Sequence, residues 1–120
     1  MNEYSFSVII PAHNEEKYIG KCLRSIVSAA KYVRPDKVEI IVVANRCTDK
    51  TTAIAKHYGA KVIINDDKCI AAIRNAGVKA ASGEIIVTID ADSMMTKYSL
   101  RGIKEMLESG YFTASEIASE

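Results

Sequence analysis

The stretch from Val38 to Ala44, which reads VEIIVVA, decides the fold class. Its nearly continuous apolar run indicates a strand that is buried on both faces, as in a parallel sheet covered by helices. A similar run from Ser7 to Ile10 precedes it, and we expect that strand to stop at Pro11. Two more runs follow at Lys61–Ile64 and Glu84–Ile89. The sequence therefore predicts four buried strands.

Helical periodicity separates these strands. Apolar residues recur three and four positions apart between Ile19 and Ala30, and Asn14 is the expected N-cap of that helix. The pattern predicts further helices over residues 51–58, 69–81 and 98–107. Small residues line one face of the third helix: Ala72, Ala76 and Ala80. Such a face lets the helix approach a sheet closely. The alternating order predicts an α/β fold with a doubly wound, mostly parallel sheet and helices on both faces, as in Rossmann-like proteins.

Composition narrows the class of protein. The chain has 120 residues, 48% of them hydrophobic and 26% charged, which is typical of one soluble globular domain and excludes disordered or collagen-like chains. The net charge of +1 gives no electrostatic footprint for nucleic acid. No apolar run approaches the roughly 20 residues that span a bilayer, and the N-terminus does not resemble a signal peptide. We therefore expect a cytoplasmic location and no membrane span in this chain.

The cysteine count argues against stabilisation of the fold by disulfide bonds or by a bound zinc ion. Three cysteines without a CxxC spacing favour neither a disulfide framework nor a zinc site. No linker or repeat interrupts the alternating pattern, so we expect one α/β domain over residues 1–110 and a C-terminal tail over residues 111–120.

Asp90 and Asp92 are the sharpest candidates for chemistry. Ligands of open α/β sheets bind beyond the carboxyl ends of the strands, and these two acids follow the fourth predicted strand. If the backbone stays extended past Ile89, both carboxylates project to the same side and repel, and a divalent cation relieves that repulsion. Mg²⁺ and Mn²⁺ prefer such oxygen ligands together with phosphate oxygens. The alternative is a solvated turn in which one aspartate caps the next helix.

Other nucleotide-binding devices are missing. No GxGxxG follows the first strand, which disfavours a nicotinamide-binding domain, and no GxxxxGK[ST] forms a P-loop. Arg74 lies inside the third predicted helix, where it is either a solvated surface charge or a contact to a phosphate group.

Three blocks of sequence resemble family 2 glycosyltransferases of the GT-A fold. VIIPAHNEEKYIGKCLRSI resembles the opening of that family, EIIVVANRCTDKT its second-strand segment, and AAIRNAGVKAASGEIIVTIDADS the segment that runs into its DxD motif. The blocks come in the family's order and span about residues 6–95. The resemblance implies a nucleotide-diphosphate sugar, usually a UDP-sugar, bound with Mg²⁺ or Mn²⁺, and transfer of the sugar to an acceptor hydroxyl.

The resemblance also implies roles for particular residues. Pro11, Ala12 and Glu15 would line the base and ribose pocket, Asn45 would contact the base, and Arg74 would lie near the diphosphate. Asp92 would be the metal ligand, and Asp90 would approach the ribose or the metal. Where the family usually has Asp-Asp or Asp-Asn, this chain has Ala44-Asn45, so the identity of the base stays open. Arg46-Cys47 replaces the usual Gly-Ser.

Two alternatives remain beside the glycosyltransferase. Family members are considerably longer, and the half that binds the acceptor and usually supplies the catalytic base would be absent, so no base is assigned. The chain would then be a non-catalytic nucleotide-sugar-binding or regulatory module. A phosphotransfer or hydrolase domain with an aspartate nucleophile is the third hypothesis, because DADS follows a strand.

We also expect a homodimer through the free edge of the last strand. The sugar, the acceptor and the stereochemical outcome stay open.

Overall fold

The four predicted strands and the helices between them are all present in the computed structural model, which describes residues 3–110. The strands are β1 (Ser5–Ala12), β2 (Lys37–Ala44), β3 (Lys61–Ile64) and β4 (Ile85–Thr88). The helices are α1 (Ile19–Lys31), α2 (Thr51–His57), α3 (Ile70–Ala80) and α4 (Ser99–Ser109). The predicted tail over residues 111–120 lies outside the described residues.

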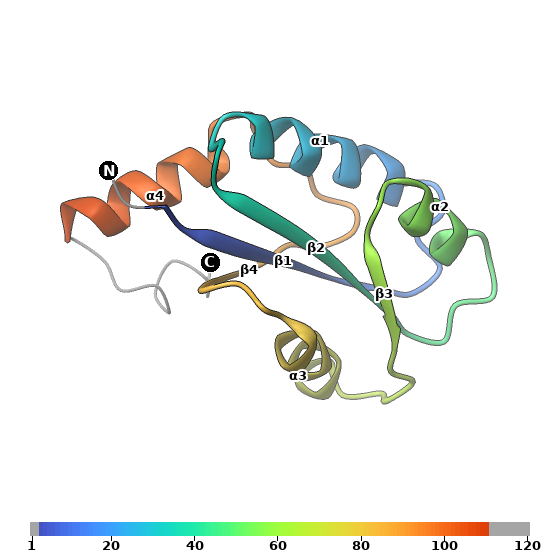
Figure 1. The fold of residues 1–120 in the computed structure, drawn as a ribbon. Coiled ribbons are helices and arrows are strands. Elements are labelled where there is room, and N and C mark those ends of the chain that lie inside the picture. Colours follow the sequence, from blue (N-terminus) through green and yellow to red (C-terminus); the bar gives the residue numbers. More distant parts are fainter. Residues whose placement is uncertain (1–2, 111–120) are drawn as a thin grey trace.

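All the strand pairs are parallel, and the strand order in the sheet is β3-β2-β1-β4. In register, Ile9 of β1 lies between Ile41 of β2 and Thr88 of β4. The chain adds β2 and β3 on one side of β1 and then crosses to the other side for β4 (Figure 1). The switch in strand order therefore falls between β1 and β4, where open α/β sheets bind ligands.

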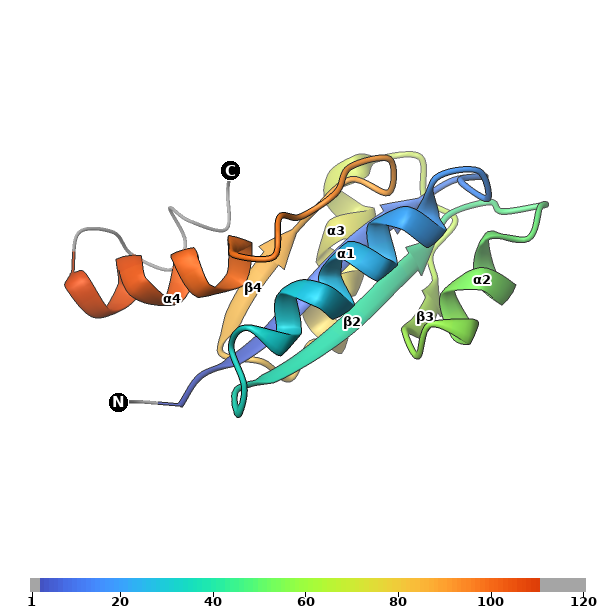
Figure 2. The same cartoon turned by 90° about the horizontal axis from the view of Figure 1, so that it is seen from above.

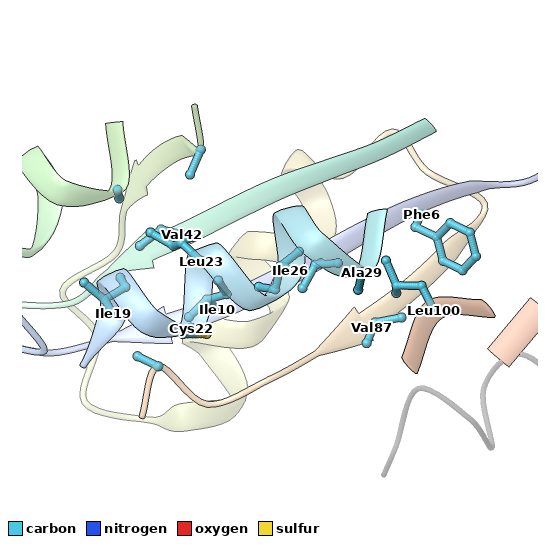
Figure 3. Close-up of a cluster of buried hydrophobic side chains, with 14 of the residues drawn as sticks. Phe6, Ile10, Ile19, Cys22, Leu23, Ile26, Ala29, Val42, Val87 and Leu100 are labelled. Atoms are coloured by element: carbon cyan, nitrogen blue, oxygen red, sulfur yellow. The ribbon is translucent and has the colours of Figure 1, made fainter. Parts of the chain in front are cut away.

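Helices cover both faces of this sheet, which confirms the doubly wound prediction. Helices α1, α2 and α4 lie on one face and α3 on the other (Figures 1 and 2). Successive side chains of a strand point to opposite faces, so Ile10 packs under α1 while Ile9 packs against Ile73 of α3. The larger cluster joins Leu23 of α1 to Leu100 of α4 (Figure 3).

The closest approach of α3 to the sheet is at Gly77 and not at the alanines that the sequence singled out. A Cβ added there would lie 2.5 Å from Ile9 Cγ2 and 3.0 Å from Val43 Cγ2. Ala76 and Ala80 pack beside this point and are half-buried. The helix therefore rests on the sheet through a position that only glycine fits without movement.

Two predicted boundaries are wrong. The first strand does not stop at Pro11, since Pro11 pairs in register with Val43. Backbone groups of successive strand residues point to opposite sides, so those of Ile9 and Pro11 point to the same side. Ile9 O accepts from Ile89 N on the β4 side. The missing N–H of Pro11 faces that same side, beyond the last β4 pair, so no ladder bond is lost.

Asn14 does not cap α1, because the helix begins at Ile19 with Tyr18 at its N-cap and without a side-chain cap. Instead, Asn14 takes a left-handed conformation with φ of 49° in the preceding loop. Asparagine tolerates that region better than most residues.

Within the described range, no helix is both long and apolar enough to cross a membrane.

Candidate functional site

The loops that follow β1 and β2 are joined by side-chain hydrogen bonds. Asn14 Oδ1 accepts from Thr48 N at 2.7 Å, and Glu15 N donates to Thr51 Oγ1 at 2.8 Å. The His13 ring adds a third link, since its Nδ1 lies 2.7 Å from Asn45 O. A carbonyl oxygen only accepts, so Nδ1 carries the proton there. The first loop is thus held against the second at the carboxyl edge of the sheet.

Asp49 anchors the start of α2 and the first loop together. Its carboxylate accepts from Thr51 N at 2.9 Å, from the Thr51 hydroxyl, and from Glu16 N at 3.2 Å. Burial raises the pKa of Asp49, but these hydrogen bonds outweigh it and hold the pKa below its usual value. Asp49 was not among the predicted site residues, although an aspartate just before a helix is a recognisable capping signal.

Asn45 fixes the loop between β3 and α3. Its Nδ2 donates to Asn65 O at 2.6 Å and to Asp67 O at 2.7 Å, and its Oδ1 accepts from Arg46 Nε at 3.0 Å. Only 3% of Asn45 is exposed. Both amide hydrogens are therefore used inside the protein, and a base contact from this side chain is limited to the remaining acceptor capacity of Oδ1. Arg46 takes a left-handed φ of 48° beside it, with its N donating to Asp66 Oδ1 at 2.9 Å.

The backbone does not stay extended between Asp90 and Asp92. Strand β4 ends at Thr88, and Ser93 N donates to Asp90 O at 2.9 Å, which closes a turn. The geometric premise of the paired-carboxylate prediction is therefore wrong in detail. The capping alternative is not observed either, because α4 has Tyr98 at its N-cap and no side-chain cap. Both aspartates are exposed at the tip of this turn.

The charges of Asp90 and Asp92 nevertheless act on residues of the first loop and of α1. Burial is the largest cause that raises the pKa of Glu15, and Asp92, Asp49 and Asp90 raise it further, while His13 lowers it. Burial also raises the pKa of Cys22 in α1 to about 11, with added contributions from Asp92 and Asp90. The β1 and β4 loops thus share one negatively charged field at the switch point.

The remaining predicted residues lie around this field with different exposure. Pro11 is half-buried and Ala12 is 3% exposed, with Ala12 O accepting from Asn45 N at 2.8 Å. Arg74 is exposed on α3 and makes no hydrogen bond or ion pair with any residue between 3 and 110. Asp90 and Asp92 therefore act on Glu15 through their charge, whereas Arg74 is an exposed cation on α3, on the other face of the sheet.

This donor set suits an open divalent-cation site. Between residues 3 and 110, no three His, Cys, Asp or Glu side chains are close enough to enclose a metal by themselves. Mg²⁺ is usually held by one or two carboxylates, with water and substrate phosphates completing its shell. Two exposed aspartates in one turn match that requirement.

Comparison with known proteins identifies the family. The model of glycosyl transferase family 2 matches residues 7–115. The chain therefore belongs to the family 2 glycosyltransferases, as the three sequence blocks indicated. The glycosyltransferase AglE of Haloferax volcanii is 33% identical over 111 residues, covering 87% of this chain and 36% of that protein.

Solved structures agree on the GT-A fold. Staphylococcus aureus TarS in complex with UDP-GlcNAc superposes with a TM-score of 0.72 at 28% identity, over 88% of this chain and 31% of that one. Mycobacterium tuberculosis glucosyl-3-phosphoglycerate synthase, in complex with Mn²⁺, UDP and glucosyl-3-phosphoglycerate, gives 0.69 at 25% identity, over 87% and 39%. The chain spans about a third of the length of these proteins, and it matches their N-terminal, Rossmann-like part.

Proposed function

We propose that this chain is the donor-binding part of a metal-dependent glycosyltransferase, which takes a nucleotide-diphosphate sugar, with a UDP-sugar as the first candidate. The observations that carry the proposal are the position of Asp90 and Asp92 directly after β4, beside the β1–β4 switch point, and the membership of the chain in this family. Two structural neighbours are complexes with UDP-GlcNAc and with UDP and Mn²⁺, which supports the same class of ligand here.

Each predicted residue would have a separate role at the carboxyl edge of the sheet. Asp92 and Asp90 would hold Mg²⁺ or Mn²⁺, and the cation would stabilise the departing diphosphate. Pro11 and Ala12 would form the wall of the base and ribose pocket. Glu15 would line the same pocket, where burial and then the nearby acids Asp92, Asp49 and Asp90 raise its pKa.

The other predicted residues act around that centre. Asn45 would contribute mainly by holding the loop at Asn65 and Asp67 in place. Arg74 would approach the diphosphate only if its exposed side chain swings toward the strand ends. The cytoplasmic location and the division at residue 110 stay predictions.

A calorimetric titration of UDP with Mn²⁺ tests the proposal. We expect saturable binding that requires the metal, and Asp92→Asn should weaken it by more than tenfold, because a neutral amide is a poor ligand for a hard cation. Glu84→Gln is the matched control: Glu84 is an exposed acid at the opposite end of β4, so its loss should leave binding unchanged. No heat with UDP or GDP, with either metal, would contradict the proposal.

The alternative is a non-catalytic nucleotide-sugar-binding or regulatory module. It is kept because no residue between 3 and 110 is assigned as a catalytic base. An assay for free sugar or a transferred sugar separates the two, because a binding module releases neither.

A further inference from the structure

A groove is lined by residues of α1 and α2 and of the segments that flank α2. The two helices lie on the same face of the sheet (Figure 2). It encloses about 490 Å³, which lies within the range of roughly 300–1,000 Å³ for small-molecule sites. Small residues open it: Gly20 on α1 and Ala53 on α2 both line the groove. A Cβ at Gly20 would lie 3.6 Å from Arg24 Nη1 and 3.9 Å from Ile54 Cγ2, so this position has room for about one methyl group.

The charges along this groove are strongly one-sided. Its charged lining consists of Lys17, Lys21, Arg24, Lys50 and Glu16. Four cations against one acid give the groove a formal charge of +3, whereas the rest of the chain carries −2 within the total of +1. None of the four cations forms an ion pair with another residue in the described part of the chain. The groove therefore carries a locally positive potential in a chain of nearly zero net charge.

Arg24 is held in place at the groove by Tyr58. Its Nη1 donates to Tyr58 Oη at 2.6 Å, and its Cζ lies 5.8 Å from the ring centroid. The His57 ring packs edge-on against the same tyrosine at 5.1 Å. Since Tyr58 Oη accepts from Arg24, its own hydrogen remains available to an anion. A guanidinium, a phenol O–H and several ammonium groups around one hollow form a donor set suited to phosphate oxygens.

We propose that the groove between α1 and α2 binds a ligand through a phosphate group, with Arg24 and Tyr58 as the fixed donors and Lys17, Lys21 and Lys50 as the flexible ones. This site lies along the flanks of two helices, away from the Asp90–Asp92 turn, and it needs no metal. It does not depend on the proposed function. The phosphate belongs to either a soluble metabolite or a lipid headgroup.

The first test is a titration of inorganic pyrophosphate into the chain in EDTA, so that no cation can bridge pyrophosphate to the aspartates. We expect one saturable site. Arg24→Gln and Lys21→Gln should each weaken binding about tenfold, and Tyr58→Phe should weaken it less, because it removes one hydrogen bond and keeps the ring. The matched control is Lys79→Gln, which removes an exposed cation from α3 on the opposite face and should change nothing. Circular dichroism melts check that each variant is folded.

The second arm identifies the source of the phosphate. Sedimentation with vesicles of phosphatidylcholine alone and with added phosphatidic acid shows whether a headgroup is bound. Arg24-dependent binding in either arm supports the site and names its source. Absence of binding in both arms, or equal losses from Arg24→Gln and Lys79→Gln, overturns it. Asp92→Asn separates this proposal from the first: it should abolish metal-dependent UDP binding and leave the pyrophosphate titration intact, and loss of both would place the phosphate at the strand ends.

Discussion

At the scale of single residues, the Glu39 carboxylate joins three segments at the amino end of the sheet. It accepts from the Ser7 hydroxyl, from Ser82 N at 2.7 Å and from Ser82 Oγ at 3.0 Å, and Gly83 N donates to Ser7 Oγ at 2.8 Å. The hydrogen bond from Ser7 is the largest cause that lowers the pKa of Glu39, and the bonds from Ser82 add to it. The ionised carboxylate therefore stabilises the join between β1, β2 and the loop before β4.

Glu39→Gln should make the protein less dependent on pH for its stability. A carboxyl whose pKa is lowered by folding contributes stability above its unfolded pKa, and this contribution is lost as the pH falls through the folded value. The wild-type midpoint of thermal unfolding should therefore drop more steeply than that of Glu39→Gln on going from pH 7 to pH 3. At pH 7 the variant should be less stable by about 1 kcal/mol, a figure reduced for the partial exposure of this group.

Thermal melts across that pH range provide the measurement, with Glu84→Gln as the control acid on the same side of the molecule. Parallel curves for the wild type and Glu39→Gln would show that the hydrogen bonds of Glu39 do not influence stability.

Single residues also mark the limit of the site prediction. Asp90 and Asp92 were predicted because polar side chains directly after a buried strand are conspicuous in the sequence, and Glu15 was implied by the family resemblance. The hydrogen bonds from Asn45 to Asn65 O and Asp67 O were not predicted. They depend on the path of the β3–α3 loop, which no local sequence pattern reveals. The unpaired position of Arg74 likewise depends on how far α3 stands from the aspartates.

At the scale of elements, α3 and α4 place their interior glycines in opposite surroundings. Gly77 of α3 contacts the sheet so closely that an added Cβ would lie 2.5 Å from Ile9 Cγ2, whereas nothing lies within 4 Å of a Cβ at Gly102 of α4. A helix position prefers alanine to glycine by up to about 1 kcal/mol when no contact intervenes. Glycine-to-alanine substitution at the two positions therefore distinguishes the effect of packing, which acts at Gly77, from that of helix propensity, which acts at both.

Gly77→Ala should destabilise the protein by about 1–3 kcal/mol, because the methyl group pushes α3 off Ile9 and Val43. Gly102→Ala should stabilise it by about 0.5–1 kcal/mol through helix propensity alone. Urea unfolding of both variants measures the difference. A stabilising Gly77→Ala would mean that α3 has room to move and that the close approach is not a constraint.

A second link between elements holds α4 to the amino end of the sheet. Lys104 Nζ lies 2.8 Å from Asp36 Oδ2, and Asp36 Oδ1 accepts from Tyr4 N at 3.1 Å. Asp36 Oδ2 has no well-aligned hydrogen bond, so the ammonium is what compensates this buried charge. This close contact with the Asp36 carboxylate is also the largest cause that raises the pKa of Lys104.

At the scale of the whole molecule, β4 is an edge of the described sheet. It pairs with β1 on one side, and no described strand lies on its other side. An edge strand can be a template for another strand, so the homodimer expected from the sequence stays a prediction. The homodimer would place two switch points in one particle.

Sedimentation velocity over a micromolar dilution series tests the dimer. We expect a mass that shifts from one chain of 13.1 kDa to two as the concentration rises. Ile86→Pro, which removes a backbone donor from β4, should shift the equilibrium toward the monomer if the chain remains folded by circular dichroism. A monomeric mass at every concentration would contradict the prediction.

Local patterns in the chain were enough to predict the strands, the helices and their alternation, because apolar periodicity is set by burial on one or both faces. They were also enough to point to Asp90 and Asp92, since strand ends are local features. The order β3-β2-β1-β4, the contact of Gly77 with Ile9 and the basic groove between α1 and α2 depended on contacts between segments far apart in the chain. These contacts join residues that are far apart in the sequence and close in space. Local sequence patterns carry no information about such contacts, so only the folded structure reveals them.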